Sequence, residues 1–238
     1  MGETVKYETD FTLTENPMVG DGGWTRGLAE GLDWTNPATN GSVAYGTQTI
    51  HTAPPFDDSI AHRSGFANDH LVEITVFNNQ TFGTADFEIE TYSRLTISAH
   101  SARGYEGDWI NTGIGTSQYA LAEWNGALND FTILGANPMF TGVATATGDK
   151  VRQRIIGKVI HVYSTPLSTG IMTELGTYDT SGDASPIATG QPGFGFWDAG
   201  GDIDAHRTDF AVSHFLADDG LAGIAPTGKF PYVIPFTW

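Results

Sequence analysis

Three carboxylates at alternate positions are the sequence's clearest candidates for acid–base chemistry. In the run Asp86-Phe87-Glu88-Ile89-Glu90 they fall at i, i+2 and i+4, which is one face of a β-strand. Glycosidases that retain configuration place two carboxyl groups about 5 Å apart, so side chains here must close a longer backbone spacing. A catalytic role for Glu88 and Glu90 is one hypothesis. A solvated polar face without chemistry is the other.

The polar face of this predicted strand continues beyond the carboxylates, through Tyr92 and Arg94 to His100. Sugar sites combine an aromatic platform with carboxylate, amide and guanidinium groups. The run from Tyr105 to Trp109 is expected to border this face, without an assigned role. For Trp109 and Trp124, burial in the core is the alternative interpretation. The candidates for glycan binding are Glu88, Glu90, Tyr92, Arg94, Trp109 and Trp124.

A glycine-rich run carries the candidate metal ligands. Asp198, Asp202 and Asp204 offer hard oxygen atoms, which suit Ca²⁺, although such runs are also plain turns. Asp57 and Asp58 are a weaker candidate pair. The seven histidines show no closely spaced ligand set, so the sequence gives zinc catalysis little support.

Apolar and polar residues alternate in several segments of the chain, as is typical of β-strands. These predicted strands must position the candidate side chains. Val72, Ile74 and Val76 alternate with polar residues, and residues 151–156 and 159–163 continue the pattern. Gly 30 and Pro 11 exceed average usage, which suits tight turns and disfavours long helices. We expect one all-β domain, a two-sheet antiparallel sandwich, which is a common arrangement at 238 residues.

The charge balance excludes one class of partner. The formal net charge is −17, and no segment gathers lysine and arginine, so we expect no nucleic acid. Without cysteine, neither disulfides nor thiolate-bound zinc can stabilise the fold. The given chain shows no signal-peptide pattern and no run near the ~20 apolar residues of a membrane span. We expect a virion or extracellular protein with no membrane partner.

Three segments late in the chain share an order with a known superfamily. Gly148-Asp149 opens a strand, Gly157 to Tyr163 reads Gly-x-x-Ile-x-Val-Tyr, and Gly190-Gln-Pro-Gly193 precedes an aromatic strand. This order resembles the concanavalin A-like (LamG-like) lectin and glucanase jelly rolls. The resemblance implies a jelly-roll sandwich whose first and last strands pair, here residues 7–13 and 209–215.

The resemblance leaves function open, because this superfamily contains lectins, glycan-binding modules, glucanases and lyases. Its laminarinase-like glucanases use Glu-x-Asp-x-(x)-Glu, whereas Asp86 and Glu88 stand here in exchanged order, so the expected nucleophile is missing. We therefore favour a non-enzymatic, lectin-like surface- or glycan-binding module. A secreted polysaccharide hydrolase or lyase using Glu88 and Glu90 is the alternative.

The composition changes after the jelly roll, which we place at residues 1–218, and residues 219–238 are interpreted as a C-terminal arm. Its three prolines prevent a central strand, and its aromatic side chains make free exposure costly, so it packs on its own domain or on a neighbour. We predict a phage decoration or tail accessory protein that contacts glycans or neighbouring virion proteins and forms homo-oligomers. The assembly candidates are Phe230, Tyr232, Phe236 and Trp238.

Overall fold

A computed structural model of the chain describes residues 6–27, 34–49, 56–79, 86–111, 117–199 and 206–220. Among these residues no helix has the length and apolar character that a membrane crossing requires. One 3₁₀ turn, η1 (Thr180–Gly182), follows β15. The strands are β1 (Lys6–Thr9), β2 (Thr14–Glu15), β3 (Trp24–Arg26), β4 (Ala38–Asn40), β5 (Ala44–Tyr45), β6 (Ser59–Arg63), β7 (His70–Asn78), β8 (Asp86–Ser98), β9 (Ser101–Asn111), β10 (Gln118–Gly126), β11 (Phe131–Ile133), β12 (Phe140–Thr141), β13 (Lys150–Ile156), β14 (Val159–Thr165), β15 (Thr173–Asp179), β16 (Gln191–Ala199) and β17 (Phe210–Asp218).

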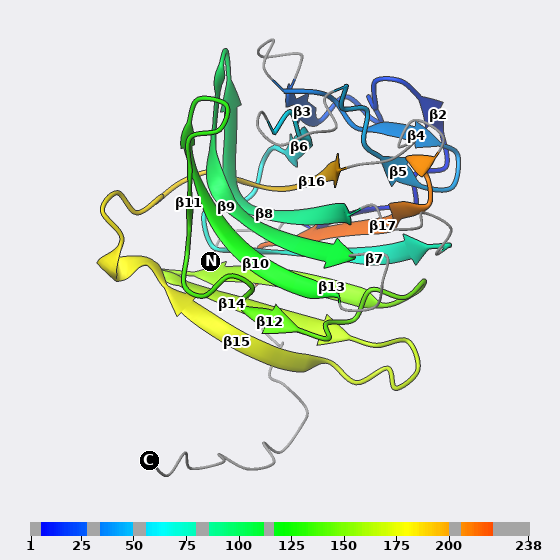
Figure 1. The fold of residues 1–238 in the computed structure, drawn as a ribbon. Coiled ribbons are helices and arrows are strands. Elements are labelled where there is room, and N and C mark those ends of the chain that lie inside the picture. The colour runs from blue at the N-terminus through cyan, green and yellow to red at the C-terminus, as the bar shows by residue number, and fades with distance from the viewer. Residues whose placement is uncertain are drawn as a thin grey trace.

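The described strands form two antiparallel sheets that pack against each other (Figure 1). The first sheet has the order β15-β14-β13-β7-β17-β5-β4-β2, and β1 also pairs with β17. The second has the order β11-β10-β9-β8-β16-β6-β3, and β12 also pairs with β10. Strands far apart in sequence, such as β8 and β16, are therefore neighbours. This arrangement confirms the predicted all-β jelly-roll sandwich.

The sequence pattern predicted several of these strands and their faces. The first and last strands pair as expected, with Tyr7 opposite Ala217, although β1 ends at Thr9 and pairs with residues 215–218 rather than 209–215. On β7, Val72, Ile74 and Val76 are buried in the core between the sheets, as their alternation indicates. Burial of such side chains, at ~25 cal/mol per Å² of apolar surface, holds the two sheets together.

One polar residue in the core joins the two sheets through its side-chain amide. Gln153 of β13 accepts hydrogen bonds from the hydroxyls of Thr91 (3.2 Å) and Tyr119 (3.3 Å). Its amide nitrogen donates to Ser93 Oγ and to the carbonyl oxygen of Tyr105, both at 3.0 Å. Because buried polar atoms cost free energy unless they are paired, this network favours one alignment of β13 with β8, β9 and β10.

Candidate functional site

Carboxyl groups gather on the face of the second sheet that is turned away from the first, here called the outer face. Glu90 of β8 stands directly opposite Asp108 of β9. Because side chains alternate along a strand, Glu88 and Glu106 project from the same face as these two. Asp58, just before β6, belongs to the same group, since the ligand oxygens of Asp58, Glu90 and Glu106 lie within 4.8 Å of one another. Carboxylates placed directly opposite each other destabilise a sheet, so this group is a candidate site.

A pocket of about 240 Å³ opens beside these carboxyl groups on the outer face. Four acids line it: Asp58, Glu88, Glu106 and Asp108. Phe56, Trp124 and Phe131 provide aromatic walls, while Ala120 and Ala122 of β10 are small and leave the space open. In the strand register these alanines lie opposite Asp108 and Glu106. The pocket thus combines acidic and aromatic walls at one place.

Two aromatic donors fix the carboxylate of Glu106. The Tyr92 hydroxyl donates to Glu106 Oε1, and Trp124 Nε1 donates to Oε2 at 2.8 Å. Tyr92 lies opposite Glu106 in the register, and Trp124 packs edge-on against Trp34 with ring centroids 4.6 Å apart. Glu106 is therefore held in one orientation toward the pocket.

Glu90 lies behind the pocket and is fully buried. Among the described residues, its carboxylate oxygens meet no donor other than the neighbouring carboxyl group of Glu106. Its place depends on Gly195 of the neighbouring strand β16, because a Cβ atom there would lie 2.1 Å from Glu90 Oε2. The glycine therefore provides the space that this carboxyl group occupies.

Burial and neighbouring carboxylates raise the pKa values of these carboxyl groups. Burial raises the pKa values of Asp58, Glu90 and Asp108 well above their usual range, and neighbouring carboxylates raise them further. Burial also raises the pKa of Glu106, although the donors Tyr92 and Trp124 oppose that change.

Several buried polar atoms on the outer face have no hydrogen-bond partner among the described residues. They include both an acceptor and donors: Asp108 Oδ1 and the indole nitrogens of Trp34 and Trp197. Trp197 stands opposite Glu88 in the register. Leaving such a group unpaired costs about 1–3 kcal/mol, and of these residues Asp108 is the one that lines the pocket.

Arg94 does not lie on the outer face, which corrects the prediction from alternation. The register between β8 and β9 shifts between Ser93 and Thr96, and Arg94 has the left-handed φ of 55°. This β-bulge inserts one residue and reverses the faces that follow, so Leu95 and Ile97 take the outer side with Tyr92. The predicted polar face therefore ends at Tyr92.

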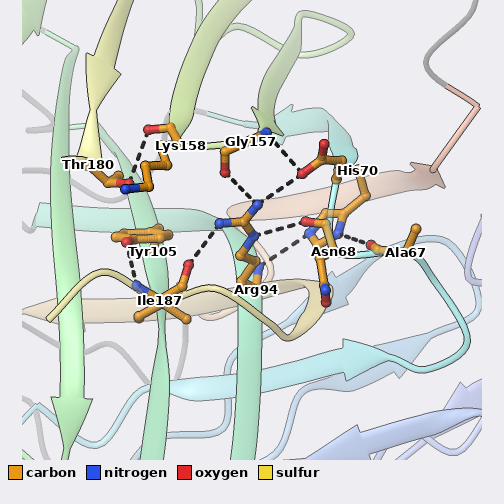
Figure 2. Close-up of polar contacts among 10 residues, drawn as sticks. Ala67, Asn68, His70, Arg94, Tyr105, Gly157, Lys158, Thr180 and Ile187 are labelled. Carbon is orange, nitrogen blue, oxygen red and sulfur yellow. Dashed lines mark hydrogen bonds and ion pairs between the residues drawn. The ribbon is translucent and has the colours of Figure 1, made fainter.

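Arg94 instead joins segments that are far apart in the sequence (Figure 2). Its guanidinium donates to the carbonyl oxygens of Asn68 (2.9 Å), Ile187 (2.8 Å) and Gly157 (2.7 Å), and to Asp69 Oδ1 at 2.9 Å. The side chain is buried while that of Asp69 is partly exposed. Arg94 is a structural residue with its hydrogen-bonding capacity largely used.

Of the two predicted aromatic platforms, one lies at the pocket and one does not. Trp124 lines the pocket, although it is almost fully buried. Trp109 belongs to the core between the sheets, where its Nε1 donates to Thr91 Oγ1 at 3.1 Å. Position 109 has the opposite strand parity to Asp108, so its side chain points to the opposite face.

The predicted calcium ligands fall only partly within the described residues. Asp198 is buried, and its burial raises its pKa to about 8. It alternates with Trp197 along β16, so it points away from the pocket. Asp202 and Asp204 lie outside the described residues, as do the arm residues Phe230, Tyr232, Phe236 and Trp238. The cation on this loop and the docking of the arm stay predictions.

Sequence reasoning missed most of the residues that complete the pocket. Glu106 and Asp108 have no role predicted from sequence, although they alternate with the core residues Tyr105 and Trp109. Asp58 was only a weak metal candidate, because nothing in sequence places it beside β8. Register and strand order supply that information.

A larger hollow of about 910 Å³ lies elsewhere, beside β12, β14 and β15. Among the described residues that line it, Asp149 is the one with a charged side chain. That carboxylate already accepts hydrogen bonds from the backbone N–H groups of Ala146 (2.9 Å) and Leu167 (2.8 Å). Since this hollow presents no cluster of chemically active groups among the described residues, the smaller acidic pocket is the stronger site.

No protein-family description matches the chain, and no curated protein matches it. Solved structures do match. A xylan β-1,4-xylosidase from Bacillus halodurans has a TM-score of 0.50 at 12% identity, over 88% of this chain and 38% of that one. The CBM2 module of the evolved Dit of Lactobacillus casei BL23 phage J-1 gives 0.47 at 12%, over 90% and 95%. A β-porphyranase from Bacteroides plebeius gives 0.46 at 11%, over 91% of both chains.

At these identities the likeness concerns the fold. The sheet order, the paired terminal strands and the similarity to the xylosidase agree on a concanavalin A-like jelly roll. Because this fold carries unrelated activities, function has to be argued from the pocket itself.

Proposed function

We propose that this chain is a lectin-like, non-enzymatic module that binds a glycan in the outer-face pocket. The observation that carries this proposal is the pocket wall itself, where four carboxyl groups, including the unpartnered Asp108 Oδ1, lie beside the aromatic rings of Trp124 and Phe131. Sugar hydroxyl groups both donate and accept hydrogen bonds, and the apolar face of a sugar ring packs on aromatic walls such as Phe131.

The size and charge of the pocket limit the glycan. At about 240 Å³ the pocket is smaller than the ~300–1,000 Å³ typical of drug-sized ligands, so it suits one sugar unit of a longer chain. Its four acidic lining residues, Asp58, Glu88, Glu106 and Asp108, repel sulfate and uronate groups. We expect neutral sugar units to bind better than anionic ones in the absence of a cation.

A polysaccharide hydrolase is the second candidate function, with a different residue pair from the one predicted. Glu90 is fully buried and does not line the pocket, which argues against direct contact with substrate. Asp58 and Glu106 both line it, and their oxygens lie within 4.8 Å, close to the ~5 Å between the two carboxyl groups of retaining glycosidases. Release of reducing sugar that disappears in Glu106→Gln would establish this alternative.

Binding to an immobilised polysaccharide panel tests the primary proposal. Phe131→Ala removes one pocket wall on a short edge strand, and we expect it to abolish retention on the polysaccharide that binds wild-type protein. Leu167→Ala is the matched control, because it removes an exposed apolar side chain at the other hollow. Equal retention of both variants and wild type would contradict a glycan site at the pocket.

Display on a phage particle is the finer part of the proposal, and it rests on sequence features alone. If the module is a virion decoration or tail accessory protein, it should copurify with particles through density-gradient centrifugation. Its absence from purified particles would remove this part while leaving the glycan-binding proposal intact.

A further inference from the structure

We infer that Asp58, Glu90 and Glu106 bind one divalent cation of the Ca²⁺ type at the base of the outer-face pocket. This inference rests on the proposed function and deepens it, since the cation would lie where the sugar hydroxyls enter. The three residues come from three separate segments: the residue before β6, the middle of β8 and the middle of β9.

The geometry of the three carboxyl groups fits one shared ion. One oxygen from each lies within 4.8 Å of the others. Two oxygens on opposite sides of a Ca²⁺ ion are ~4.6–5.2 Å apart, since Ca–O distances are ~2.3–2.6 Å. The side chains therefore need little rearrangement to coordinate it.

Glu90 supplies the observation that distinguishes this group from an ordinary acidic cluster. Its side chain is completely buried, and among the described residues no donor other than a neighbouring carboxyl group, that of Glu106, reaches its carboxylate oxygens. Gly195 leaves the space in which one of these oxygens lies, 2.1 Å from where a Cβ atom would stand. A buried carboxylate with no other donor lacks a partner that a cation would provide.

The carboxylates around Glu90 favour a positively charged ligand. Burial raises the pKa of Glu90, and the carboxylates of Asp58, Glu106, Asp108 and Glu88 raise it further. A bound divalent ion would offset part of this repulsion and strengthen its own binding through the low dielectric of the site.

Ligand chemistry selects the kind of ion. The three groups offer only oxygen ligands, without histidine or cysteine, which favours Ca²⁺ or Mg²⁺ over transition metals. Ca²⁺ takes ~6–8 oxygen ligands, and three carboxylates leave positions open. Asp58 and Glu106 face the pocket, so water or sugar hydroxyl groups can occupy the remaining positions.

Titration of the metal-stripped full chain with CaCl₂ tests the site, read by calorimetry and by the melting temperature. We expect one equivalent of Ca²⁺ to bind and to raise the melting temperature, because an ion specific to the folded state stabilises it. Glu90→Gln keeps the side-chain shape and removes a charge, so it should fold and bind Ca²⁺ at least ~10-fold more weakly. Asp58→Asn is the second variant and should behave alike.

Asp198→Asn is the matched control, because Asp198 is also a buried carboxyl on the same sheet but points away from the pocket. It tests the loop site predicted from sequence. Full Ca²⁺ binding by Asp198→Asn, together with loss in Glu90→Gln and Asp58→Asn, supports the inference. Loss only in Asp198→Asn, or no Ca²⁺ binding by wild-type protein, overturns it.

Glycan binding measured with and without EDTA separates this inference from the proposed function. We expect chelation to weaken retention on the bound polysaccharide by at least ~10-fold. Retention that is unchanged by EDTA and lost in Phe131→Ala would refute the cation site and leave the glycan site standing. No retention under any condition would refute the proposed function, whatever the calcium result.

Discussion

Replacing Arg94 should destabilise the sandwich strongly, although Arg94 does not line the pocket. Three of its four guanidinium hydrogen bonds go to backbone carbonyls, those of Asn68, Ile187 and Gly157, at 2.7–2.9 Å. Arg94 thereby joins the loop before β7, the turn between β13 and β14, and the segment before β16 (Figure 2).

The expected loss can be worked out from these contacts. A buried acceptor left without a donor costs about 1–3 kcal/mol, and water that enters the site recovers part of that cost. The side chain of Asp69 is 37% exposed, so we discount that ion pair. We therefore expect Arg94→Ala to lower the free energy of unfolding by about 3–5 kcal/mol. Arg94→Lys keeps the charge and can reach fewer carbonyls, so it should lose roughly half as much.

Urea unfolding measures this difference, and the slope with denaturant should stay unchanged. Lys6→Ala is the control, since Lys6 belongs to an ion pair with both side chains about half exposed, and it should remain within ~0.5 kcal/mol of wild type. A loss below ~1 kcal/mol for Arg94→Ala would show that the carbonyls find other partners and that Arg94 does not hold these loops.

Three further predictions concern acid stability, the pocket and the arm. His70 donates from one ring nitrogen to the Ala67 carbonyl and accepts the Arg94 N–H on the other, and burial lowers its pKa from 6.5 to about 4 with Arg94, Asp69 and Asp219 as its charged neighbours. The unfolded chain therefore binds the extra proton between pH 6.5 and about 4, so stability falls as the pH drops through that window, by up to about 3 kcal/mol. His70→Gln should flatten this part of the pH profile of unfolding, and an unchanged profile would contradict a neutral buried histidine. Gly195→Ala should displace the Glu90 carboxyl and abolish ligand binding, whereas Gly182→Ala, whose added Cβ would meet no atom within 4 Å, should have no effect on retention. Truncation after Asp219 should leave the cooperative unfolding transition intact and reduce assembly in light scattering; unfolding of the truncated chain would place the arm in its own domain's core.

Much of the fold could be predicted because each buried strand repeats its side-chain pattern locally. The alternation of Val72, Ile74 and Val76, and that of Val151, Gln153 and Ile155, follows from burying one face of a strand. The same rule placed Glu88 and Glu90 together on one face. These inferences need no knowledge of distant strands.

The rest depends on features that are not local. A single inserted residue at the β-bulge reverses the faces from which side chains project after Tyr92. An arginine such as Arg94 gives no indication in the sequence that its φ is positive. Asp58 joins the pocket only because β16 lies between β8 and β6. Strand order and register, which depend on the whole core, therefore decided which acids became neighbours.

The most direct test of the central claim is a crystal structure of the chain soaked with oligosaccharides from the polysaccharide that it retains. We predict one sugar unit in the outer-face pocket, packed on Phe131 and hydrogen-bonded to Asp108. Sugar density at another surface, with this pocket empty and Phe131→Ala retained normally, would contradict the account.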